Sequence, residues 1–264
     1  MKVIILLIIL IITLVILLYL IKKKIIEKFE NEYNLIIITS VIHTINKPLS
    51  YSATRSVFSP EERIKQTIDT INSIKRYIPN SYIVLIEGSE LSVVEKDILK
   101  ENVDEIFQCK NIENISSKFK GLGETSMISE FINSEIFKKI RINYNLKSIT
   151  KITGRYKLNE NYSYSKYPLD KIVLKQEGDD WHVTSSYRVG SNQIDNYIKE
   201  LDRVLNLYKD YERSSNSNNE LSLEKTMFWG LSSDNIYAIR HPDKYGVIGL
   251  SSADGTIIES FIIN

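Results

Sequence analysis

The segment that most constrains the fold is a short apolar run of mostly β-branched residues at positions 35–41, Leu-Ile-Ile-Ile-Thr-Ser-Val. Continuous apolar runs of this length are typical of strands buried on both faces of a parallel sheet. Isoleucines then recur at helical spacing over 64–78, and a second extended run follows at 81–86. This alternation of strand and helix predicts a parallel sheet with right-handed crossover helices.

Residues at the start of the first helix support this prediction. Ser59 supplies a cap oxygen, Pro60 suits the first helical position, and Glu61 and Glu62 place negative charge at the positive end of the helix dipole. The same kind of reasoning predicts helices over 91–100, 120–143, 193–211 and 221–231, and strands over 103–109 and 148–153. Aromatic, turn-rich sequence at 162–188 predicts a small antiparallel portion.

The amino-terminal end carries an apolar run at 3–21, interrupted only by Thr13 and Tyr19 and closed by three lysines. About 20 apolar residues at 1.5 Å per residue match the roughly 30 Å hydrocarbon core of a bilayer. A cleavable signal peptide fits less well, because its apolar core has about 7 to 15 residues and precedes a small-residue cleavage site. The run therefore predicts a single transmembrane helix, with the membrane as a partner through residues 3–21.

The predicted domains are a transmembrane anchor at 1–24, a juxtamembrane linker at 25–34 and one α/β domain at 35–264. Positive charge lies mainly after the apolar run, which predicts a single-pass membrane protein with its globular part in the cytoplasm; a lumenal location stays open. The 34 Lys and Arg residues balance the 33 Asp and Glu residues. A nucleic-acid-binding surface needs clustered excess cation, so the composition argues against a nucleic-acid partner.

Four segments carry a resemblance to a known family. They are Ser-Pro-Glu-Glu-Arg at 59–63, the strand at 83–87, Lys-Gly-Leu-Gly-Glu at 120–124 and Lys-Ile-Thr-Gly-Arg-Tyr at 151–156. In this order the chain resembles the glycosyltransferase-A, or nucleotide-diphospho-sugar transferase, superfamily over about residues 35–260. It is most similar to uncharacterised proteins of large DNA viruses and bacteria with a Lys-x-[Ser/Thr]-Gly-Arg-Tyr motif.

This resemblance implies a Rossmann-like, mostly parallel sheet and a specific reaction. The implied protein is a membrane-anchored glycosyltransferase that moves a sugar from a nucleotide diphosphate donor to a hydroxyl of a glycan, lipid or protein. The loop after the first strand contains no glycine, which argues against a dinucleotide site and against an S-adenosylmethionine-dependent transferase. Glu87 ends the second strand, where a carboxylate can accept hydrogen bonds from a ribose; a solvated turn residue is the alternative.

The donor site departs from the family in one respect. Most members hold Mn²⁺ or Mg²⁺ on an Asp-x-Asp motif, whereas this chain has Lys151 and Arg155 in that segment. Cationic side chains can neutralise a diphosphate, so the sequence predicts donor binding without a metal or other cofactor. Asp179 and Asp180 leave a displaced Mn²⁺ or Mg²⁺ site open, although two acids after Gly178 are more typical of an exposed turn.

Further donor-binding candidates are Lys120 and Glu124, at a glycine-containing helix start whose free amides attract anions, and Arg55. A capped helix start is the alternative for the first two. Arg63 could also reach a diphosphate, although an arginine on a helix is more often part of a surface ion pair.

The resemblance implies that Glu224 is the catalytic base of an inverting transfer. Phe228 and Trp229 are acceptor-binding candidates that could stack on a sugar ring, with core packing as the alternative. His43 and His182 are candidate acid-base residues without metal-ligand spacing, and a structural or surface role is the alternative for each. The missing Asp-x-Asp also leaves a second function open, a non-catalytic membrane-anchored binding or virion protein on the same fold.

Overall fold

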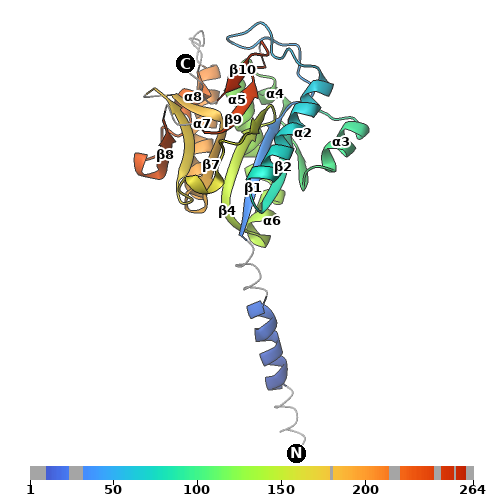
Figure 1. Cartoon of the computed structure of the whole chain (residues 1–264), viewed down its shortest axis with the longest axis vertical. Helices are drawn as coiled ribbons and strands as arrows, with labels where there is room; N and C mark the ends of the chain where they lie inside the picture. The colour runs from blue at the N-terminus through green and yellow to red at the C-terminus, as the bar shows by residue number, and fades with distance from the viewer. Residues whose placement is uncertain are drawn as a thin grey trace, which may run out of the picture.

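The computed structural model describes residues 10–23, 32–178, 181–213, 221–240, 245–252 and 254–259. Seven strands form a mixed, mostly parallel sheet in the order β3-β2-β1-β4-β7-β6-β8 (Figure 1). They are β1 (Glu32–Ser40), β2 (Ser81–Glu87), β3 (Glu105–Gln108), β4 (Asn145–Thr153), β6 (Ile172–Glu177), β7 (Trp181–Gly190) and β8 (Ile236–Ile239).

The sheet has a parallel half and a mixed half. Strand β1 pairs in parallel with both β2 and β4, and β2 pairs in parallel with β3. Strand β7 is antiparallel to β4 and to β6, while β6 and β8 are parallel. A second, antiparallel sheet has the order β10-β9-β5. Its strands are β5 (Tyr156–Leu158), β9 (Val247–Leu250) and β10 (Ile257–Glu259).

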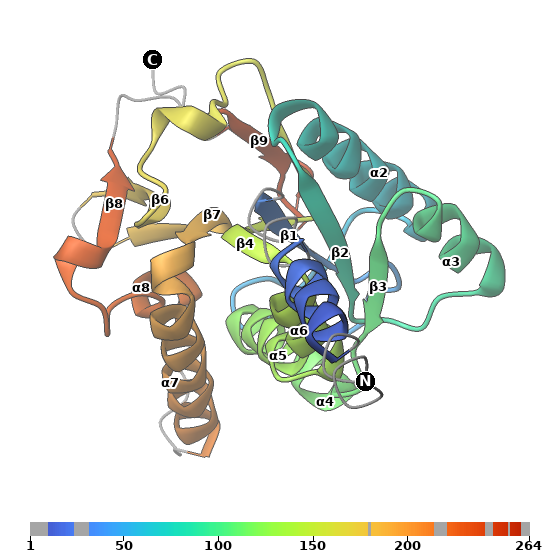
Figure 2. The same cartoon turned by 90° about the horizontal axis from the view of Figure 1, so that it is seen from below.

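Helices cover both faces of the large sheet (Figure 2). One face carries α2 (Pro60–Tyr77) and α3 (Val93–Lys100), and the other carries α5 (Lys120–Ile132), α6 (Glu135–Asn143) and α7 (Ile194–Arg213). Two single-turn helices, α4 (Ile112–Ile115) and α8 (Leu223–Thr226), flank the second group. Because side chains alternate along a strand, Leu35 and Ile37 pack toward α5 and α7, whereas Ile36 and Ile38 pack toward α2.

Local signals explain where the helices begin and end. The Ser59 hydroxyl accepts from the Glu62 amide, and the Glu62 carboxylate accepts from the Ser59 amide at 2.7 Å, so the predicted helix start is confirmed as a capping box. The single helix predicted over 120–143 is wrong: it is two helices, because the Ser134 hydroxyl accepts from the Phe137 amide and starts α6. The helix predicted over 221–231 is too long, because the structure has only the single turn of α8 there.

The predicted transmembrane helix is also wrong. At the amino-terminal end, the structure describes helical residues 10–23. Across the described ranges, no helix has both the length and the apolar character needed to cross a bilayer. The transmembrane helix, the membrane as a partner through residues 3–21 and the single-pass localisation are therefore corrected. Residues 1–9 and 24–31 lie outside the described residues, so the domain boundaries at 24 and 34 stay predictions.

Candidate functional site

Two adjoining cavities open where the carboxyl ends of β1 and β4 meet the start of α5. The smaller one, here called the cationic pocket, has a volume of about 90 Å³ and is lined by Arg55, Arg63 and Arg155. The larger one, here called the large cavity, has a volume of about 480 Å³. Lys120 and Glu124 line both, so the two spaces adjoin at these residues. Parallel sheets usually bind ligands at this edge.

Four cations surround the cationic pocket, and none forms an ion pair with a carboxylate of the described residues. They are Arg55, Arg63, Lys120 and Arg155. The arginines donate to neutral oxygens: Arg55 to backbone carbonyls such as that of Ile115 (3.2 Å), and Arg155 through Nε to a β9 carbonyl (3.4 Å). Each guanidinium is thus held in place by neutral oxygens and forms no direct ion pair with a carboxylate of the described residues.

Arg63 is the most deeply buried of these cations, with 5% of its surface exposed. Its Nε donates to the Val41 carbonyl at 2.6 Å, and its NH1 group donates to the Ser56 hydroxyl at 3.0 Å. Burial lowers the pKa of Arg63, Arg155 lowers it further, and Glu87 opposes the shift. The guanidinium is still charged at neutral pH, so an anion in the pocket would relieve an unfavourable arrangement of charge.

Lys120 is the first residue of α5, and its side chain is open to the cavity. Its Nζ makes no hydrogen bond or ion pair with the residues that the structure describes. The protein atoms around it, and Arg155, lower the pKa of Lys120. The Phe119 cap residue supplies no side-chain hydrogen bond, so the first amides of α5 are also uncapped at this edge.

Glycines bring these cations together. The Gly154 amide donates to the Thr39 carbonyl at 2.9 Å, and a Cβ at this position would lie 3.0 Å from the Thr67 hydroxyl. The chain therefore passes tightly between β1 and α2 and delivers Arg155 to the pocket. In α5, a side chain at Gly121 would collide with the Tyr208 ring of α7, so this glycine serves helix packing rather than direct phosphate contact.

Lys151 was predicted to bind the donor, but in the structure it faces Glu124 instead. Its side chain is 1% exposed, and Nζ donates to Glu124 Oε1, to the Thr153 hydroxyl (3.0 Å) and to the Thr184 carbonyl (2.7 Å). A lysine ammonium has three donors, so none is left for a ligand. Lys151, assisted by Lys120 and Arg155, lowers the pKa of Glu124 against the opposing effect of burial.

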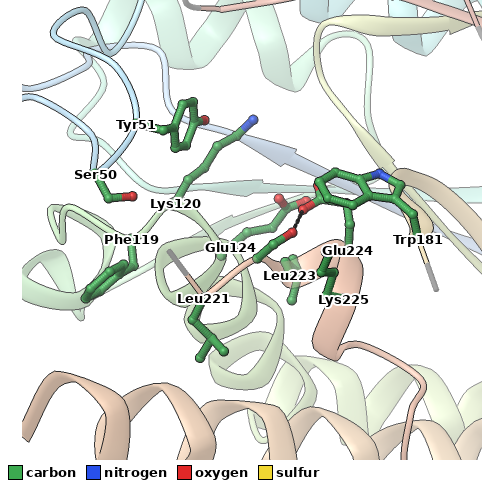
Figure 3. Close-up of a pocket in the computed structure, with 12 residues that line it drawn as sticks. Ser50, Tyr51, Phe119, Lys120, Glu124, Trp181, Leu221, Leu223, Glu224 and Lys225 are labelled. Carbon is green, nitrogen blue, oxygen red and sulfur yellow. Dashed lines mark hydrogen bonds between the residues drawn. The ribbon is translucent and has the colours of Figure 1, made fainter. Parts of the chain in front are cut away.

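Glu224 lies on the wall of the large cavity. Its carboxylate accepts from the Thr184 hydroxyl (3.1 Å) and the Ser222 hydroxyl (2.7 Å). Figure 3 shows the Glu124 and Glu224 side chains turned toward the same region, with the Trp181 ring beside them. The Lys120 side chain extends away from them, on the side of Tyr51. Sequence reasoning missed Trp181 and Tyr51; the rarity of tryptophan in the chain is the only signal that pointed to the first.

Three other predicted residues lie away from both cavities. Glu87 is fully buried and accepts from the amides of Ile42 (2.9 Å) and Ser89 (2.8 Å), so it ties together the loops after β1 and β2; burial raises its pKa. Phe228 is 1% exposed and packs in the core, whereas Trp229 is 60% exposed and lines neither cavity.

The candidate histidines have structural partners. His43 is exposed and contacts the Glu95 carboxylate at 3.0 Å, and His182 Nδ1 lies 3.0 Å from the Met227 carbonyl. Asp179 and Asp180 fall outside the described residues. Among the residues that are described, no group of three or more His, Cys, Asp or Glu side chains is placed to hold a metal ion. Donor binding without a metal stays a prediction.

Comparison with known proteins gives no match by sequence and a distant similarity to solved structures. No known protein family matches the sequence, and no curated protein matches it. Among solved structures, the chain is similar to the crystal structure of the glycosyltransferase GlyE from Streptococcus pneumoniae TIGR4, with a TM-score of 0.44 and 8% identity. The match covers 79% of this chain and 45% of GlyE, so the chain spans less than half the length of that protein.

Proposed function

We propose that this chain is a glycosyltransferase that binds the diphosphate of a nucleotide sugar in the cationic pocket. The observation that carries the proposal is the group of four cations without a carboxylate partner at the ligand-binding edge of the sheet. Four positive charges gathered around one pocket, one of them buried, repel one another, and the single carboxylate that lines this pocket among the described residues, Glu124, is engaged by Lys151. A bound diphosphate would supply the missing negative charge, and guanidinium groups bind phosphate oxygens in a bidentate manner.

The large cavity has the size and the lining to hold a sugar and its acceptor. Its volume of about 480 Å³ lies within the usual range for small-molecule sites. Tyr51 and Trp181 offer aromatic surface for the apolar face of a sugar, and two carboxylates offer acceptors for its hydroxyl groups. Because the large cavity joins the cationic pocket at Lys120 and Glu124, a sugar linked to a bound diphosphate would extend into it.

In the proposed reaction, Glu224 is the base. It takes the proton of the acceptor hydroxyl as that oxygen forms a bond to the anomeric carbon of the sugar. The bond from this carbon to the phosphate oxygen breaks, and the diphosphate leaves with the electron pair. Arg55, Arg63, Lys120 and Arg155 stabilise the charge that develops on the leaving group. Attack on the face opposite the leaving group would invert the anomeric centre.

The test uses the full chain with a panel of nucleoside diphosphates and nucleotide sugars, with Mn²⁺ or with EDTA. A ligand at 100 times its Kd stabilises a protein by about 2.7 kcal/mol, which for a domain of this size raises Tm by about 5 to 10 °C. We expect such a shift for one nucleotide, in EDTA as well as in Mn²⁺. Replacing Arg155 by Met should weaken binding about tenfold to a hundredfold, because a charge-assisted hydrogen bond is lost.

The matched control is Arg141→Met, since Arg141 on α6 forms an exposed ion pair with Asp195 on α7. It should leave binding unchanged. Absence of binding by every nucleotide from the folded chain would contradict the proposal. Binding without turnover for any hydroxyl acceptor would instead identify a nucleotide-binding protein without catalysis. A requirement for Mn²⁺ would contradict the metal-free part of the proposal alone.

A further inference from the structure

We propose that Glu124 binds a hydroxyl of the donor sugar next to the diphosphate, and that Lys151 is the positioning residue that holds Glu124 for this contact. The inference rests on the proposed function and adds which residue recognises the sugar. Glu124 is suited to this role by its place at the junction of the cationic pocket and the large cavity. The first carbons of a sugar attached to a bound diphosphate would lie at this junction.

The two carboxylate oxygens of Glu124 have different surroundings. Oε1 accepts from Lys151 Nζ and lies 3.4 Å from the Thr153 hydroxyl. Oε2 makes no hydrogen bond within the described ranges, and the side chain keeps 14% of its surface exposed, on the cavity side. One oxygen is thus fixed by the protein, and the other is open to a ligand.

Lys151 fixes this arrangement through β4 and β7. It is paired with Ile37 on β1 and Tyr187 on β7, which sets the position of its backbone. From there Nζ reaches Glu124 on α5 and the Thr184 carbonyl on β7. The hydroxyl of the same Thr184 donates to Glu224. Lys151 therefore contacts Glu124 directly, and it also contacts Thr184, the residue that donates to the second carboxylate of the cavity.

The chemistry of the open oxygen favours a hydroxyl ligand. A carboxylate accepts hydrogen bonds only, so it binds the O–H groups of a sugar and repels the phosphate oxygens that the neighbouring cations attract. The ion pair with Lys151 opposes protonation of Glu124, which would turn the acceptor into a donor. A charge-assisted hydrogen bond of this kind is worth about tenfold to a hundredfold in affinity.

The experiment compares two affinities of the full chain by calorimetry: the Kd of a nucleotide sugar and the Kd of the nucleoside diphosphate without the sugar. The probes are UDP with UDP-glucose and GDP with GDP-mannose, and the pair that binds is carried forward. The variants are Glu124→Gln, Lys151→Met and the double variant, with Glu135→Gln as the matched control. Glu135 also pairs with a lysine, Lys138, but lies on the exposed face of α6.

We expect the ratio of the nucleotide-sugar Kd to the nucleoside diphosphate Kd to rise at least tenfold in all three variants and to stay unchanged in Glu135→Gln. A variant that is only less stable would raise both Kd values by the same factor and leave the ratio unchanged. If Lys151→Met does not fold, Glu124→Gln and the double variant, which leaves no unpaired charge, still decide the outcome.

The possible failures can be told apart. An unchanged ratio in folded Glu124→Gln overturns the role of Glu124 while leaving the proposed function intact. A raised ratio in Glu124→Gln with a wild-type ratio in folded Lys151→Met overturns the positioning role of Lys151. Absence of nucleoside diphosphate binding in the wild-type chain overturns the proposed function, and this inference with it.

Discussion

Replacing either member of the Lys151–Glu124 pair should give variants whose stabilities depend on pH in opposite directions. Removing one partner of a buried ion pair typically costs about 3 to 5 kcal/mol, because the other charge is left buried. The remaining group can avoid that cost by becoming neutral. The free energy needed to neutralise it at a given pH, which follows from its ordinary pKa, is then the largest stability that the variant can lose. Lys151 is almost fully buried, whereas Glu124 is partly open to the cavity, so Lys151 should come closer to its limit than Glu124 does.

These upper limits are calculated from the distance between the pH and the ordinary pKa, at about 1.36 kcal/mol for each pH unit. In Glu124→Gln, neutralising Lys151 at pH 7 from an ordinary pKa of about 10.4 costs about 4.6 kcal/mol. In Lys151→Met, protonating Glu124 at pH 7 from an ordinary pKa of about 4.3 costs about 3.7 kcal/mol. Residual hydrogen bonds and the open side of Glu124 reduce both values. We expect losses of about 3 to 4 kcal/mol for Glu124→Gln and about 2 to 3 kcal/mol for Lys151→Met.

The signs of the pH dependence are opposite. In Glu124→Gln, burial lowers the pKa of Lys151 in the folded state, so the unfolded chain binds more protons and stability rises with pH. In Lys151→Met, the pKa of Glu124 loses the main influence that lowers it against burial. If burial then raises that pKa above its unfolded value, the folded chain binds more protons and stability falls as pH rises. In the double variant, the free energy of unfolding should fall by about 1 kcal/mol or less, and its dependence on pH should match that of the wild type.

Urea unfolding at pH 5.5, 7.0 and 8.5, followed by circular dichroism, measures these differences. The wild type, both single variants, the double variant and the surface control Glu135→Gln form one set. Two results would refute the reasoning: single variants whose pH slopes match the wild type, or single losses that simply add in the double variant. Either would mean that the two charges do not stabilise each other in the fold.

Three further predictions concern other parts of the structure. Gly121→Ala should lower stability by about 1 to 3 kcal/mol in thermal unfolding, because its methyl group would collide with Tyr208; an unchanged Tm would show that α5 and α7 can separate freely. Trp181→Ala should weaken nucleotide-sugar binding about tenfold in calorimetry, whereas Trp229→Ala, on the surface, should not; the reverse would place the sugar elsewhere. Cys109 should react with a thiol reagent at pH 8 only after unfolding, because burial raises the pKa of its thiol and the charge of Glu130 raises it further. Fast labelling of the folded chain would contradict this.

The parts of the fold that sequence predicts well are those set by neighbouring residues. The apolar run of β1 and the capping box of Ser59 and Glu62 act over a few positions, so composition and spacing reveal them. The addition of β7 and β6 to the large sheet depends on antiparallel pairing with β4, a contact between distant segments. The pattern at 162–188 suggested antiparallel structure but not its partner.

The candidate site shows the same division. Arg55, Lys120, Glu124, Arg155 and Glu224 were predicted, and the structure gathers them around adjoining cavities. The burial of Lys151 and Phe228 could not be predicted from their residue types. A lysine between Thr150 and Ile152 looks like an exposed strand residue, and only the position of α5 turns it into the partner of a carboxylate. Similarly, Phe228 follows a short helix and adopts a φ of 71°, which directs its ring into the core.

The place of Lys151 on β4 also bears on misfolding. Its neighbours on the strand alternate, so that Ile149 faces α5 and α7 while Ile152 faces α2. A slip of β4 by one residue would exchange these faces and insert an ammonium group among Ile36, Ile38 and Ile71. These isoleucines cannot neutralise the ammonium group, so burying it would destabilise the mispaired sheet by several kcal/mol. The correctly paired sheet would not bear this cost. A charge that serves the site would thus also discriminate against a mispaired sheet while the chain is still folding.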